Sequence, residues 1–123
     1  MSNEVDAENR SKPDDKLMMN EIPGYEKFAG LLNSTFTVQT DDAQSIKTEL
    51  VQISEQRLAG RQEMFSIVFR GPADIALGQA LRHFHHEDIG DFELFITPVR
   101  QDEQGFYYEA VFNLIRQPAE PTV

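Results

Sequence analysis

Cysteine and tryptophan are absent from this chain of 123 residues. Without cysteine, the protein forms no disulfide, offers no thiolate to a zinc ion and has no thiol nucleophile. The sequence has no apolar run near the roughly 18 residues that a membrane-spanning helix needs. Its beginning, MSNEVDAENRSKPDDK, lacks the basic start and the apolar core of a signal peptide. These absences indicate a soluble protein of the cytoplasm.

Basic residues are scarce as well, since 11 Lys and Arg stand against 21 Asp and Glu, for a formal net charge of −10. Proteins that coat nucleic acid or anionic membranes depend on Lys and Arg, so we expect neither function here. Hydrophobic residues make up 40% of the chain, and nine of its aromatic residues are Phe. The length suits one domain, and Phe is expected to supply most of the large core side chains.

The two ends of the chain differ from its middle. Residues 1–19 are acidic and polar and have no periodicity. They cannot bury enough apolar surface to offset the entropy of ordering, so we predict a disordered tail. Residues 117–123 contain two prolines and are predicted to form a flexible C-terminus. A single β-barrel-like domain is predicted for residues 20–116.

A short amphipathic helix is predicted for residues 20–32, NEIPGYEKFAGLL. Tyr25, Phe28 and Leu32 are three and four residues apart, so they share one helix face. Helices of this length are marginally stable alone. We therefore expect this helix to dock on the sheet and to close one end of a barrel.

Alternation of apolar and polar residues predicts a mainly β domain with six strands. The predicted strands are residues 34–40, 45–56, 61–70, 78–87, 90–100 and 105–114. Residues 58–61 are predicted to be a loop, and a switch of apolar parity at Val51 indicates a bulge. Short connections favour an antiparallel meander, which hides both of its edges by curling into a small barrel. The side chains expected inside include Phe65, Phe69, Leu94 and Phe112.

Four stretches of this region carry a family likeness. They are FSIVFRGP (65–72), LGQ (77–79), HEDIGDFELFITPV (86–99) and GFYYEAVFN (105–113). The chain resembles, over about residues 21–113, a bacterial family of small proteins classed as a domain of unknown function. Its pattern reads F-S-L-x-F-R-G-P, L-x-Q-G-x-Y, H-P-x-L-G-x-F-x-L-F-L-x-P-V and Y-E-A-V-F-N. Ala80 and Glu87 depart from it, standing where the family has Gly and Pro, which leaves the local turn geometry open.

The resemblance implies no known activity, so it carries over no catalytic residue. Members of the family are often encoded beside phage-tail-collar-like fibre proteins, which implies an assembly or accessory role. The motif residues that stand out are Arg70, Gly71, Pro72, His86, Gly90, Glu109 and Asn113.

One histidine cluster has the spacing of a metal site. Strand alternation would place His83, His85 and Glu87 on one face, as the His-x-His pair of cupin-like barrels requires. The chain has three histidines in all, so any further ligands would be carboxylates. We favour the other interpretation, in which His83 and His85 are solvated strand residues and His86 bonds a turn. No metal and no cofactor is therefore expected.

Arg70 lies at the end of a predicted strand in the most distinctive motif, and its role has two interpretations. It could present a bidentate donor to a ligand carboxylate. We favour a structural role, in which it bonds Asp74, Glu109 or backbone carbonyls and fixes the turn. Glu109 and Asn113 could likewise be binding groups, but such residues more often pair across strands.

The sequence contains no catalytic constellation, no nucleophile elbow and no phosphate-binding glycine loop. We therefore expect a non-enzymatic structural or accessory protein that binds a protein partner. The alternative is a barrel that binds a small molecule or a metal through the region from His83 to Glu87. A homo-oligomer could form through an uncovered edge strand, and no residue of the sequence decides this.

Overall fold

The computed structural model describes residues 22–115. They form one helix and seven strands. The elements are α1 (Tyr25–Gly30), β1 (Thr35–Gln39), β2 (Ser45–Ile53), β3 (Arg57–Ala59), β4 (Gln62–Gly71), β5 (Ala80–His86), β6 (Gly90–Asp102) and β7 (Gly105–Ile115). The tail expected at residues 1–19 and the C-terminus expected at 117–123 lie outside the described residues.

Six of the strands close into an antiparallel barrel, as the alternation predicts. They follow one another in the order β2-β1-β5-β6-β7-β4, and a pairing of β2 with β4 closes the ring. Every strand pair is antiparallel. The predicted bulge in β2 is confirmed, because the register with β4 shifts between Leu50 and Gln52.

The seventh strand corrects the prediction of a loop at residues 58–61. Ala59 pairs with Gln62, so β3 and β4 form a hairpin around a two-residue loop. Gly60 opens that loop with φ of 62°, a backbone conformation that glycine adopts without steric cost. Because β3 pairs with β4 alone, it lies outside the closed ring.

The strand order consists of two meanders rather than one. β1, β2 and β4 form the first, and β5, β6 and β7 form the second. Residues 72–79 connect them, so that β5 pairs with β1 instead of its sequence neighbour β4. This connection is anchored to the interior, since Leu77 is buried and its backbone N–H donates to the Tyr108 hydroxyl at 3.0 Å.

Aromatic side chains fill the barrel. The four residues expected inside, Phe65, Phe69, Leu94 and Phe112, are all buried. The Phe65 and Phe112 rings stack with centroids 4.4 Å apart. Phe84 joins the two meanders inside, with its ring 4.9 Å from Phe69 and 5.6 Å from Phe92. The interior is thus a packed core.

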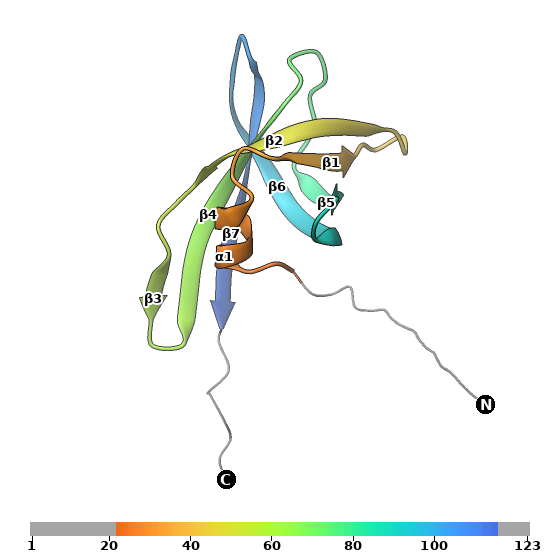
Figure 1. The fold of residues 1–123 in the computed structure, drawn as a ribbon. Helices are drawn as coiled ribbons and strands as arrows, with labels where there is room; N and C mark the ends of the chain where they lie inside the picture. The colour runs from red at the N-terminus through yellow and green to blue at the C-terminus, as the bar shows by residue number, and fades with distance from the viewer. Residues whose placement is uncertain (1–21, 116–123) are drawn as a thin grey trace, which may run out of the picture.

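Helix α1 closes one end of this core but is shorter than the predicted 20–32. Phe28 is fully buried, with its ring centroid 5.9 Å from Phe92 of β6 and 5.6 Å from Phe112 of β7. The paired residues of β6 and β7 end at Thr97 and Glu109, so the helix lies where these two strands diverge (Figure 1). Phe28 therefore fills the gap that the end of the ladder leaves.

The predicted burial of Leu32 is wrong, because this side chain is exposed. The helix ends at Gly30, and Asn33 takes φ of 72°, which turns the chain into β1. Leu31 packs against the core instead, together with Tyr25. The helical spacing thus applies to Tyr25 and Phe28 and ends before Leu32.

Candidate functional site

Arg70 lies at the end of β4 and bonds a residue that the sequence did not indicate. Its Nη2 is 2.5 Å from Oε1 of Glu49, and both side chains are about one third exposed. The prediction that Arg70 bonds Asp74 or Glu109 is wrong. Glu49 takes their place because the β2–β4 register sets it directly opposite Arg70.

The row of outward-facing side chains that contains Glu49 and Arg70 continues across β7 and β6. Tyr107 is the partner of Arg70 on β7, and the guanidinium of Arg100 lies 3.7 Å above the Tyr107 ring. The Tyr107 hydroxyl donates to Asp102 at 3.0 Å. The backbone N–H of Gln104 and, to a smaller extent, this hydroxyl lower the pKa of the Asp102 carboxyl. These contacts bury Tyr107 although it faces outward.

Strand β4 ends at Gly71 and is followed by Pro72. At this point the backbone of β4 lies very close to the backbone at the start of β7. A β-carbon on Gly105, whose φ is 149°, would lie 1.9 Å from the carbonyl oxygen of Gly71. A β-carbon on Gly71 would lie 3.3 Å from the Tyr108 ring. Pro72 has no N–H to donate and follows the last ladder residue. The structural interpretation of this motif accounts for all of these contacts.

His86 is buried and bonds a turn, as the favoured interpretation expects. Its Nδ1 accepts the backbone N–H of Asp88 at 3.0 Å, so this nitrogen carries no proton. Nε2 therefore carries the ring proton and donates to Ser34 Oγ at 2.9 Å, while Ser34 Oγ donates to the Leu31 carbonyl at 2.6 Å. His86 thus ties the end of α1 to the β5–β6 turn. Gly90, with φ of 82°, ends that turn.

His83 and His85 lie on the outer face of β5 and approach a different acid from the expected Glu87. Oδ1 of Asp91 is 3.3 Å from His83 Nε2 and 2.7 Å from His85 Nδ1. The hydrogen bond from His85 lowers the pKa of the Asp91 carboxyl, and the bond from His83 acts in the same direction.

Strand β5 ends at His86, so its alternation does not extend to Glu87. Asp91 takes that place because it pairs with His85 in register. Within residues 22–115, no group of three or more His, Asp or Glu side chains is arranged to hold a metal ion.

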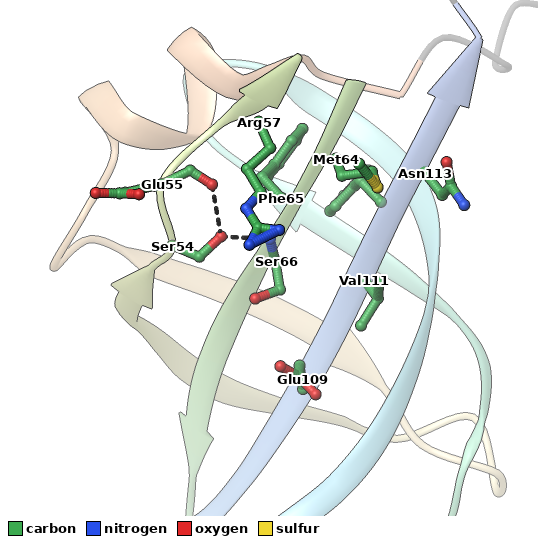
Figure 2. Close-up of a pocket in the computed structure, with 10 residues that line it drawn as sticks. Ser54, Glu55, Arg57, Met64, Phe65, Ser66, Glu109, Val111 and Asn113 are labelled. Carbon is green, nitrogen blue, oxygen red and sulfur yellow. Dashed lines mark hydrogen bonds between the residues drawn. The ribbon is translucent and has the colours of Figure 1, made fainter. Parts of the chain in front are cut away.

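Glu109 and Asn113, two of the motif residues, line a surface groove of about 490 Å³. Its lining consists of Ser54, Glu55, Arg57, Met64, Phe65, Ser66, Glu109, Val111, Phe112 and Asn113. Arg57 extends across β4 toward Ser66 (Figure 2). Ser54 Oγ accepts the Ser66 N–H at 2.9 Å. Asn113 Oδ1 accepts from Gln62 Nε2 at 2.8 Å, so this side chain pairs across strands.

Two further hollows are lined mainly by polar side chains. One, of about 300 Å³, includes Lys47, Glu49 and Arg70. The other, of about 490 Å³, includes Lys47, His85 and Glu87. Lys47 borders both of them, on the outer face of β2.

Arg82 is a buried cation that our sequence analysis missed. It points into the barrel, where Nη1 bonds Asp41 Oδ1 and Nη2 donates to the Gly78 carbonyl, each at 2.9 Å. Nε is buried and has no hydrogen-bond partner among the described residues. Its parity with Phe84 and His86, both inward-facing, is the sequence signal that would have found it.

None of the helical residues between 22 and 115 forms a segment long and apolar enough to span a bilayer. Comparison with curated proteins gives no match, and comparison with solved structures gives none. The model of a family described as a domain of unknown function, DUF6916, matches residues 23–112. That match spans most of the barrel, from α1 to the buried Phe112 of β7. The chain therefore belongs to the DUF6916 family.

Proposed function

We propose that this protein is a non-enzymatic structural or accessory protein of the bacterial cytoplasm that acts by binding a protein partner. One observation carries the proposal: the interior is packed with aromatic side chains, while large apolar side chains are exposed on the outer face of the barrel. A barrel that binds a small molecule inside needs a cavity lined by polar groups. Here the space is occupied by rings such as Phe36, Phe69 and Phe84, so the outer surface is left for recognition.

The placement of the motif residues supports the same proposal. Gly71 and Gly105 permit a close backbone contact, and His86 holds a turn. These residues maintain the fold instead of converging on a reacting group. The sequence resemblance implies an association with phage-tail-collar-like fibre proteins. Such an association would suit a role in assembly, and the assignment as an accessory protein depends on it.

Co-purification tests this function. The full chain with an affinity tag is recovered from a lysate of cells that naturally produce it, and an unrelated acidic protein of similar size serves as control for charge-driven capture. We expect one protein to be enriched over the control and to form a stoichiometric complex when both components are purified separately. Recovery of the tagged chain alone, at lysate concentrations where it stays folded, would overturn the proposal.

A further inference from the structure

We infer that the exposed side chains of Leu81, Phe95 and Val111, here called the apolar stripe, form the docking surface for a protein whose apolar centre is flanked by Lys and Arg. This inference rests on the proposed function and specifies the face and the partner chemistry.

The apolar stripe crosses three consecutive strands of the barrel. Leu81 of β5 is the direct partner of Phe95 of β6. Thr97 pairs with Glu109 of β7, and Phe95 and Val111 each lie two residues farther along. Strand alternation therefore keeps both side chains on the outer face, just beyond the last pair of the β6–β7 ladder, where the two strands begin to diverge. Figure 2 shows Glu109 and Val111 as neighbours on β7.

These side chains lie largely in solvent. Their exposed fractions are 61% for Leu81, 53% for Phe95 and 70% for Val111. Single exposed apolar residues are ordinary, but a row of them across adjacent strands forms a patch, and such patches mark interaction surfaces. The next outward positions along the strands are polar, namely His83, Glu93 and Asn113. The apolar character is thus confined to one row of the sheet.

Acidic side chains border the apolar stripe on both sides. Glu93 precedes Phe95 by two residues on β6, and Glu109 precedes Val111 by two residues on β7. Arg57 of β3 lines the same groove as Glu109 and Val111 and reaches toward Ser66, the β4 partner of Val111 (Figure 2). This cation lies beyond the β7 end of the apolar stripe, whereas the two glutamates lie along β6 and β7. A partner with basic residues around an apolar centre complements this arrangement, and the net charge of −10 would accelerate its approach.

A second copy of the chain fits the same face poorly. A two-fold contact sets equivalent surfaces against each other, so the glutamates of both copies would lie at one interface. Like charges brought together at an interface are costly. The charge pattern therefore favours a different, basic protein as the occupant.

Site-specific photocrosslinking tests the face. Benzoylphenylalanine is placed at position 95 or at position 58 of the full chain, in cells that naturally produce it. Leu58 is a matched control, because it is an apolar strand residue with 56% exposure and lies on β3. We expect position 95 to give a discrete crosslinked protein and position 58 to give none. Crosslinking from position 58 alone, or to a second copy of the chain, would overturn the inference.

Binding to the crosslinked protein, identified and purified, then tests the partner chemistry. Phe95→Ser should weaken binding by at least about tenfold, since buried aromatic side chains dominate interfaces. Leu58→Ser should leave it unchanged. The double variant Glu93→Lys, Glu109→Lys should also weaken binding and reduce its sensitivity to salt. A partner that co-purifies but binds Phe95→Ser as well as wild type would overturn this inference and leave the proposed function intact.

Discussion

The carbonyl oxygen of Gly71 lies 1.9 Å from the position that a β-carbon on Gly105 would occupy. Two strand ends, β4 and the start of β7, therefore meet at a distance that only glycine allows. The φ of 149° at Gly105 adds a second reason for glycine, because residues with a side chain rarely adopt it.

Gly105→Ala should destabilise the fold by more than about 2 kcal/mol, since the added methyl group displaces backbone and meets an unfavourable φ. Urea unfolding followed by circular dichroism measures the change. Gly78→Ala is the matched control, because a β-carbon there meets nothing within 4 Å. Equal stability of the two variants would show that the close approach is absent.

His86→Ala should cost about 2 to 3 kcal/mol of unfolding free energy. The substitution removes two hydrogen bonds of a buried side chain and leaves the backbone N–H of Asp88 without its acceptor. His85→Ala is the comparison, since this neighbouring side chain is exposed and its loss should change stability by about 0.5 kcal/mol or less. A smaller effect at position 86 than at position 85 would contradict the role assigned to His86.

Phe28→Ala should lower stability by about 3 to 5 kcal/mol, because it opens a cavity between Phe92 and Phe112. Leu32→Ala should have little effect, since this side chain is exposed. Thermal unfolding of both variants, monitored by near-ultraviolet circular dichroism, measures the difference. Similar melting temperatures for the two would mean that α1 does not close the barrel.

Asp91 should make part of the free energy of unfolding depend on pH. Hydrogen bonds, first from His85, lower the pKa of this carboxyl below its ordinary 3.8. The unfolded chain therefore binds a proton more readily, so the contribution is present above pH 3.8 and is lost as pH falls through the folded-state pKa.

Asp91→Asn removes the titrating group. The difference in unfolding free energy between wild type and this variant should shrink as the pH falls from about 5 to about 2. Urea denaturation at several pH values measures it. Asp74→Asn, at an exposed carboxyl, corrects for general effects of charge removal. A difference that stays constant over this range would contradict the assignment of the hydrogen bonds.

Period-two alternation was sufficient to predict the six strands of the barrel and their inner face, but not β3. Phe65, Phe69, Leu94 and Phe112 are all interior, because neighbouring side chains of a strand point to opposite sides whatever the topology. The parity switch in β2 marked a real bulge for the same local reason. His86 as a turn-bonding residue was also predictable, since Asp88 is only two residues away.

Only the tertiary structure decided which strands pair and which distant residues meet. Arg70 bonds Glu49 and the outer histidines meet Asp91 because of register, and register depends on contacts between segments far apart in the chain. The pairing of β5 with β1 likewise follows from closure of the barrel. Local patterns determine which side of a strand is apolar, whereas the free energy of the whole packed core selects that strand's neighbours.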